Sequence, residues 1–290
     1  MFQHNSIDST SQEFYRWPLV TQAARNALEI RSESRYKRSV ISRLNPSNRY
    51  RLLDYFYTAF HKASLDGSPV LNPLWFKYPT DSSTFGIDLQ YFFGDSILVS
   101  PVTDENATSV TIYLPKDKFY DFATLKPVEG TGQHVTLTDV NFTTIPLHIR
   151  GGAVLPLRAA GAMTTTELRA TDFEFVVAPG AYGTASGTLY VDDGVSIEQE
   201  RTTSVEMAFT GGKLSVHGSF GFEVGAKVAR VVFLGVESAP SVVRVMDGPN
   251  IKGEGEARKV PFEYDWACKV LRVHIDTPLT HVFEVVLHNY

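Results

Sequence analysis

The chain has 290 residues, 43% hydrophobic and 20% charged, which is the composition of a folded globular protein with room for about two domains. Its 32 acidic residues outnumber its 27 basic residues, and this balance argues against a general nucleic-acid binder. No apolar run reaches the ~18 residues of a membrane span, and residues 1–14 lack the features of a signal peptide. The single cysteine, Cys268, excludes an internal disulfide and a cysteine-based zinc cluster.

The first third of the chain predicts two helical regions separated by an unusual insert. Apolar residues recur at helical spacing over 23–30 and again over 52–60. Gly67 indicates the end of the second region, and 70–74 predicts a short strand. Residues 32–49 interrupt the pattern with five basic residues against one acidic residue, a net charge of +4. This insert is either a basic patch for an anionic partner or a solvated loop, and we favour the loop.

From residue 74 onward, short β-rich runs bounded by Gly, Pro, Asp and Asn replace the helical pattern. Apolar and polar residues alternate over 213–217 and over 271–275, as in strands with one face on a core and one in water. The run 231–234 is apolar throughout and suits a central strand. Many strands without intervening helices predict antiparallel β-sandwiches.

Residues that could carry chemistry are few. The sequence has no nucleophile elbow, no phosphate-binding loop and no pair of histidines at metal-ligand spacing. Four of the histidines are expected to be surface or structural residues, namely His61, His148, His217 and His274. His4 lies in a polar loop before a helix, where it is either a substrate contact or an ordinary loop residue.

Two further patterns concern acidic residues and glycosylation. Asp192 and Asp193 precede Gly194 after a predicted strand, so they are either ion ligands or part of a turn, and we favour the turn. Asn106 and Asn141 each begin an N-x-Ser/Thr triplet, which is glycosylated only on the secretory route.

Four stretches, in order, resemble the C-terminal part of glycoside hydrolase family 31, specifically the fungal α-glucosidases. They are His4-Asn5 with QEFYRW at 12–17, the run 50–69, the run 88–102, and IPLHIRGG at 145–152 with 187–194. The resemblance implies a mixed fold, in which a C-terminal remnant of a (β/α)8 barrel is followed by two antiparallel β-sandwiches. The implied ranges are 1–73 for the end of the barrel, 74–158 for the proximal sandwich and 159–290 for the distal sandwich.

The resemblance also implies an activity, the retaining hydrolysis of terminal non-reducing α-1,4-linked glucose from maltose-like substrates by a secreted enzyme. Such enzymes use two Asp residues and neither a metal nor an organic cofactor. The family's two Asp-bearing runs, Trp-x-Asp-Met-Asn-Glu and Trp-x-Gly-Asp, do not occur here and are expected upstream of Met1. The chain alone is therefore expected to have no catalytic residue and no activity.

One substrate-binding residue carries over from the family, because His4 matches the histidine that binds the glucose hydroxyls. Phe2 and Gln3 stand where the family has Arg and Asn, Asn72 stands where many relatives have Arg, and the 32–49 insert has no counterpart. The partners implied are α-glucosides and an N-terminal chain of the same enzyme, with no nucleic acid and no membrane. The alternative is a stand-alone sandwich that binds carbohydrate or packs against a partner; a row of exposed aromatic residues would favour it.

Overall fold

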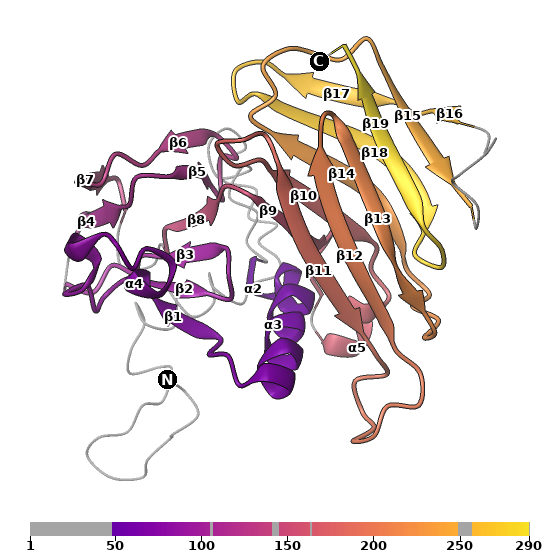
Figure 1. Cartoon of the computed structure of the whole chain (residues 1–290), viewed down its shortest axis with the longest axis horizontal. Coiled ribbons are helices and arrows are strands. Elements are labelled where there is room, and N and C mark those ends of the chain that lie inside the picture. The colour runs from indigo at the N-terminus through magenta and orange to yellow at the C-terminus, as the bar shows by residue number, and fades with distance from the viewer. Residues whose placement is uncertain (1–47, 105–106, 141–144, 163, 249–256, 290) are drawn as a thin grey trace, which may run out of the picture.

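The computed structural model describes residues 48–104, 107–140, 145–162, 164–248 and 257–289 (Figure 1). It begins with the helices α2 (Asn48–Arg51) and α3 (Leu53–Asp66), and apart from three short helical turns the remaining elements are β-strands. The second predicted helix is thus confirmed. The first predicted helix and the insert lie outside the described residues, except that α2 includes the last two residues of the insert.

Helix α3 ends where the sequence predicted. Gly67 has a φ of +73°, a left-handed conformation that costs glycine little, and its N–H donates to the carbonyl oxygen of Ala63 at 2.9 Å. The chain then enters strand β1 (Leu71–Pro73), helix α4 (Leu74–Lys77) and the single turn η3 (Ser82–Thr84).

The first sheet has six strands in the order β1-β2-β3-β8-β5-β6, and β4 and β7 form a separate two-stranded ribbon against it. All pairs in these two units are antiparallel. The bounds are β2 (Tyr91–Phe93), β3 (Ile97–Val99), β4 (Ser109–Leu114), β5 (Lys118–Asp121), β6 (Pro127–Glu129), β7 (Gln133–Thr138) and β8 (Leu147–Arg150).

The second sheet has eleven strands in the order β16-β15-β19-β13-β12-β11-β9-β10-β14-β18-β17, and it curls around its own core (Figure 1). Its bounds are β9 (Ala153–Arg158), β10 (Phe173–Ala178), β11 (Ala185–Val191), β12 (Thr203–Thr210), β13 (Lys213–Phe220), β14 (Lys227–Leu234), β15 (Val242–Asp247), β16 (Arg258–Lys259), β17 (Phe262–Asp265), β18 (Val270–Pro278) and β19 (Phe283–His288). The short helix α5 (Thr165–Arg169) separates β9 from β10. Most neighbours are antiparallel, but β10 and β14 are parallel, and so are β9 and β11.

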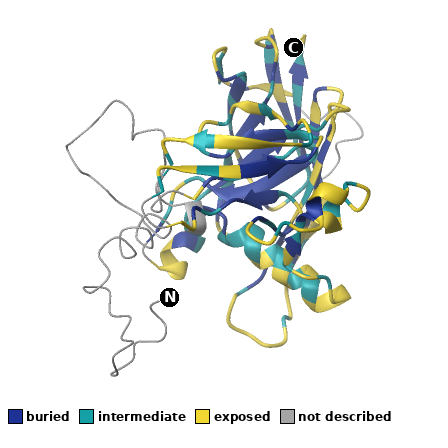
Figure 2. Ribbon diagram, turned by 90° about the vertical axis from the view of Figure 1, so that its left-hand side faces the viewer, coloured by how far each residue is buried: buried dark blue, intermediate teal, exposed yellow. Residues whose placement is uncertain are grey.

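Buried residues run along the strands of both sheets (Figure 2). The alternation of side chains along each strand divides this interior into layers. In β14, Val231 and Phe233 face the inside of the curled sheet, whereas Val232 and Leu234 face the smaller sheet. In β3, Ile97 and Val99 face the large sheet and Leu98 faces the β4–β7 ribbon. The apolar run 231–234 is therefore buried on both faces, and this confirms its prediction as a central strand.

The expected β-rich organisation is confirmed, and so is the alternation over 213–217 and 271–275. One strand of the expected proximal-sandwich range, 74–158, belongs to the other sheet. Strand β9, which ends the range 74–158, hydrogen-bonds to β10 and β11 of the larger sheet, so the chain changes sheets at Gly151 and Gly152. Gly187 of β11 permits the contact with β9, because an added Cβ would lie 2.0 Å from the carbonyl oxygen of Val154.

A buried ion pair joins α3 to the large sheet. Arg158, at the end of β9, is 1% exposed, and its Nε and Nη2 donate to the two carboxylate oxygens of Asp54 in α3 at 2.7 and 2.8 Å. Its remaining nitrogen, Nη1, donates to the carbonyl oxygen of Thr171 at 2.6 Å, and its guanidinium lies 3.9 Å from the ring centroid of Phe173. The charge is thus paired, hydrogen-bonded and stacked, as burial requires.

A second buried acid extends this joint. Glu174 of β10 accepts hydrogen bonds from Arg51 of α2 at 2.5 Å and from Arg230 of β14. Arg51 also donates through Nε to the carbonyl oxygen of Arg158 at 2.9 Å. Burial lowers the pKa of Arg51, and the neighbouring Glu174 carboxylate opposes that shift. We name Asp54, Arg158, Arg51, Glu174 and Arg230 the helix clamp.

Substitutions in the clamp test its contribution to stability. Arg158→Met removes one partner and leaves the Asp54 carboxylate without its counter-charge, so we expect a loss of about 3–5 kcal/mol in the free energy of unfolding. Adding Asp54→Leu should restore a large part of that loss. The measurement is urea unfolding, with Lys213→Met, which breaks the more exposed pair with Glu284, as the control. Equal effects of Arg158→Met and Lys213→Met would contradict the role of the clamp.

Strand β8 of the smaller sheet contains a buried histidine. His148 in β8 is 2% exposed, and its Nδ1 has no hydrogen-bond partner. Burial lowers the pKa of His148 below its ordinary value of 6.5, although the nearby Asp121 carboxylate opposes the shift. At neutral pH this imidazole is therefore uncharged in the folded protein.

The lowered pKa of His148 predicts a pH dependence of stability. Below about pH 6.5 the unfolded chain binds a proton that the folded chain resists, so stability should fall as the pH drops through that value. His148→Phe removes the titration and should flatten the curve between pH 5 and about 6.5. The measurement is urea unfolding at several pH values, with the exposed His217→Phe as the control. If His148→Phe leaves the fall of stability with pH unchanged, the assignment to His148 is refuted.

Candidate functional site

The residues predicted to bind substrate or glycan are His4, Asn106 and Asn141, and all three lie outside the described residues. Asn72, which stands where many relatives have Arg, is described and buried. Its Nδ2 donates to the carbonyl oxygens of Pro69 and Gly94, both at 3.1 Å, so it fixes the backbone between α3 and β1. The amide nitrogen of this asparagine therefore makes structural contacts, and the residue also lines the cleft described next.

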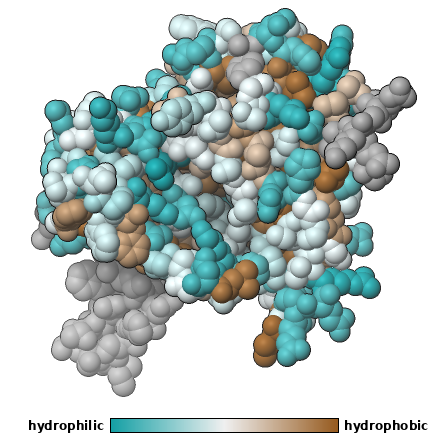
Figure 3. Space-filling view, in the orientation of Figure 1, coloured by the Kyte–Doolittle hydropathy of each residue, from teal (hydrophilic) through white to brown (hydrophobic). Residues whose placement is uncertain are grey.

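A cleft of about 800 Å³ lies between α3, the corner of β1 and α4, and the outer face of β11, β12 and β13. In the view of Figure 3, mainly hydrophilic side chains lie between the part built on the smaller sheet and the part built on the larger sheet. The charged or titratable side chains that line the cleft are Tyr55, Lys62, Lys77, Asp95, Arg150, Glu206 and His217. Such a volume would accept a small ligand, so the chemistry of these groups decides what the cleft can do.

Four of these side chains, Lys62, Lys77, Asp95 and Arg150, form ion pairs with one another or with a neighbouring residue. Lys62 donates to Asp95 at 3.1 Å, and Lys77 donates to the other oxygen of the same carboxylate. Burial by itself would raise the pKa of Asp95, but the two ammonium groups outweigh burial and lower it. Arg150 donates to Asp117 at 2.9 Å. Asp95 is consequently an ionised, doubly paired carboxylate and not a proton donor.

The same holds for the carboxyl groups of the described residues more widely. Hydrolysis of a glycosidic bond requires a carboxylic acid that stays protonated near neutral pH, which means a raised pKa. Each described carboxyl group whose pKa departs from its ordinary value is shifted downward; they are Asp66, Asp95, Asp193, Glu237 and Asp265. These groups are stabilised as anions, and none of them has the property of a general acid.

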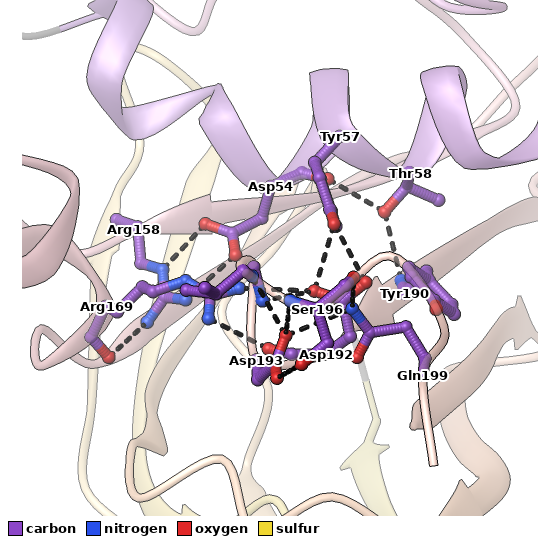
Figure 4. A network of polar contacts seen from close by, with 12 residues as sticks. Asp54, Tyr57, Thr58, Arg158, Arg169, Tyr190, Asp192, Asp193, Ser196 and Gln199 are labelled. Carbon is purple, nitrogen blue, oxygen red and sulfur yellow. Dashed lines mark hydrogen bonds and ion pairs between the residues drawn. The ribbon is translucent and has the colours of Figure 1, made fainter. Parts of the chain in front are cut away.

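The Asp192–Gly194 run forms the start of a connection, as the turn interpretation predicted (Figure 4). It begins the segment between β11 and β12, and both oxygens of Asp192 accept from the hydroxyl of Tyr57 in α3, at 3.0 and 2.8 Å. Burial and the Asp192 carboxylate raise the pKa of Tyr57 to about 12, so the phenol remains a donor. Arg169 of α5 donates to the carbonyl oxygen of Asp192 at 2.8 Å.

The end of β11 carries two further contacts with α3. The backbone N–H of Tyr190 donates to the hydroxyl of Thr58 at 3.0 Å. The ring of His61 stacks on that of Tyr190, with centroids 3.5 Å apart and an angle of 7° between the planes. His61 is therefore a packing residue, as expected, and the contacts of Asp192 and Tyr190 hold the helix against the sheet.

Within the described residues, no group of three or more His, Cys, Asp or Glu side chains is placed to hold a metal ion. Among the same residues, no helix is both long enough and apolar enough to cross a membrane. His217 lines the cleft on an exposed strand face, and His274 lies 4.0 Å from Glu263 at the surface. Both agree with their predicted surface positions.

Comparison with known proteins gives a consistent family. Residues 67–155 match the model of the glycosyl hydrolase family 31 C-terminal domain. The chain is 49% identical over 238 residues to "Probable alpha/beta-glucosidase agdC" of Neosartorya fischeri, a match that covers 82% of this chain and 25% of that protein. It is 44% identical to a "Probable alpha/beta-glucosidase" of Arthroderma benhamiae, covering 98% of this chain and 30% of the relative.

Solved structures agree with the sequence comparison. The fold superimposes on a glucosidase II α subunit with a TM-score of 0.73 and 25% identity, covering 89% of this chain and 30% of that one. A family 31 dextranase of Flavobacterium johnsoniae shares the fold with a TM-score of 0.64, covering 84% of this chain and 32% of the other. The chain thus spans about a quarter to a third of the length of these proteins. It belongs to glycosyl hydrolase family 31, of which it represents a C-terminal part.

Proposed function

We propose that this chain is the non-catalytic C-terminal part of a retaining α-glucosidase that releases glucose from the non-reducing ends of α-1,4-linked, maltose-like substrates. The observation that carries the proposal is the identity of 44–49% with fungal proteins named as α/β-glucosidases, over 82–98% of this chain but only 25–30% of theirs. In this proposal residues 1–73 end the catalytic barrel and the expected ranges 74–158 and 159–290 correspond to the proximal and distal sandwiches, except that β9 (Ala153–Arg158) belongs to the distal one.

The electrostatics support a non-catalytic role. A retaining glycosidase needs two carboxyl groups about 5–5.5 Å apart, of which one is protonated in the resting enzyme. The cleft carboxylate Asp95 is neutralised by Lys62 and Lys77, and the described carboxyl groups with shifted pKa values all favour the anion. The two catalytic Asp residues are therefore assigned to the preceding part of the longer enzyme, and His4 is proposed to complete its glucose pocket.

The distribution of exposed apolar side chains supports a partner at the N-terminal side. Eight of the fourteen large hydrophobic residues that are exposed in the described part fall within 57–89, on and just after α3. They are Tyr57, Phe60, Leu65, Leu71, Trp75, Phe76, Phe85 and Leu89. Such a concentration is typical of a surface that another part of the protein covers. The preceding catalytic part is the partner that we propose for this surface.

The alternative, a free-standing carbohydrate-binding sandwich, has less support. The aromatic residues exposed on the large sheet are Tyr182 and Trp266, and they lie in separate turns before β11 and before β18. A sugar-binding face would carry several aromatic rings side by side. The exposed aromatic residues gather instead on the helical side, where the proposed partner would cover them.

The first prediction from this proposal concerns activity. The purified 290-residue chain, checked for folding, should release no glucose from maltose or an aryl α-glucoside above a buffer blank, because positioned acid and nucleophile groups supply most of the rate enhancement. Activity should appear when the preceding part of a fungal relative is supplied. Turnover by the isolated chain that Asp95→Asn abolishes would place the active site here and refute the proposal.

The second prediction concerns the cellular route. We propose that the enzyme is secreted and glycosylated at Asn106 and Asn141, which in the sequence precede Ser109 and follow Thr138, the residues paired at one end of the β4–β7 ribbon. Protein from a fungal secretory host should lose mass when treated with an N-glycan-removing enzyme, and Asn106→Gln with Asn141→Gln should abolish that loss. Unmodified secreted protein would contradict the assignment.

A further inference from the structure

The connection between β11 and β12 exposes two large apolar side chains completely. Val195 is 87% exposed and Ile197 is 101% exposed, the latter the highest value among the large hydrophobic residues of the described part. In Figure 1 this connection extends beyond the edge of the large sheet, at the end of the sheet near α3 and α5. Two apolar side chains exposed together at the tip of an extended connection are available for contact with another part of the protein.

The tip is held in one shape by an acidic side chain. Asp193 accepts from the backbone N–H groups of Val195 and Ser196, both at 2.9 Å, and from the amide of Gln199 at 3.0 Å. The hydrogen bond from the Ser196 hydroxyl lowers the pKa of Asp193 most, and the two backbone N–H groups lower it further. The carboxylate therefore stays ionised, and both of its oxygens remain hydrogen-bond acceptors. The exposed side chains therefore stand on an ordered turn, which reduces the entropy lost on docking.

The base of the connection is fixed to α3 and to α5. Asp192 accepts a hydrogen bond from the Tyr57 hydroxyl. Gly194 has a φ of +69°, and a Cβ atom added to it would lie 2.8 Å from the guanidinium of Arg169. A larger residue at Gly194 would displace the arginine that binds the Asp192 carbonyl. The turn thus has a defined position relative to the exposed apolar side of α3, which includes Phe60.

We infer that Val195 and Ile197 form a second docking point for the preceding catalytic part of the longer enzyme, beside the apolar surface of 57–89. The inference rests on the proposed function, because it takes its partner from the family whose members are three to four times as long as this chain. The turn and α3 would then hold that part from two directions. The Tyr57–Asp192 contact sets the spacing between the two docking points.

The test compares the isolated chain with a longer protein. In the longer protein, the Neosartorya fischeri relative supplies everything that precedes its aligned 238 residues, and this chain supplies the rest. Val195→Asp with Ile197→Asp should leave the melting temperature of the isolated chain unchanged and lower that of the longer protein by about 2 °C or more. Amide exchange at residues 194–199 should be about tenfold slower in the longer protein than in the isolated chain.

Tyr182→Asp is the matched control, because Tyr182 is 95% exposed in the turn at the opposite end of β11. Equal melting temperatures for the longer protein with either change, or unaltered amide exchange, would overturn the inference. Concentration-dependent dimers of the isolated chain that Ile197→Asp abolishes would overturn it as well, by assigning the turn to a second copy. Glucosidase activity of the unmutated longer protein tests the proposed function separately, since neither readout above depends on turnover.

Discussion

The position of α3 depends on one buried ion pair, the two-pronged contact between Arg158 and Asp54. A guanidinium that donates two parallel hydrogen bonds to a carboxylate accepts only a narrow range of orientations. Because Arg158 also binds the Thr171 carbonyl and stacks on Phe173, the pair transmits the orientation of the sheet directly to the helix. One side of α3 is thereby turned to β9 and β11, and its apolar side is left facing outward.

An apolar joint of the same volume would supply much of the same stability, since the cost of desolvating two charges offsets much of their attraction. What the charged groups add is a fixed orientation of the helix relative to the sheet. Glu174 receives two arginines from different elements, so α2, β10 and β14 meet at a single carboxylate. A helix that slid by one turn would leave these groups buried without partners, and that cost selects one register.

Sequence patterns identified the parts of this fold that depend on local or repeating signals. The alternation over 271–275, the double-faced run 231–234 and the glycine stop at Gly67 all follow from spacing that short windows contain. The clamp gave no such signal, because Arg158 ends an ordinary apolar strand and its partner lies 104 residues earlier. The sequence pattern predicts a turn at Asp192, but the hydrogen bond of Asp192 with Tyr57 spans 135 residues, and no sequence motif predicts that contact.

The wide sequence separation of the clamp partners has a consequence for biosynthesis. Ribosomes add about 5–20 residues per second, so the roughly hundred residues between Asp54 and Arg158 correspond to about 5–20 s of elongation. Throughout that interval α3 has been made but the strand that will hold it has not. Asp54 therefore lacks its counter-charge, and the side of α3 that will face the sheet has nothing to pack on, until β9, β10 and β14 have been made.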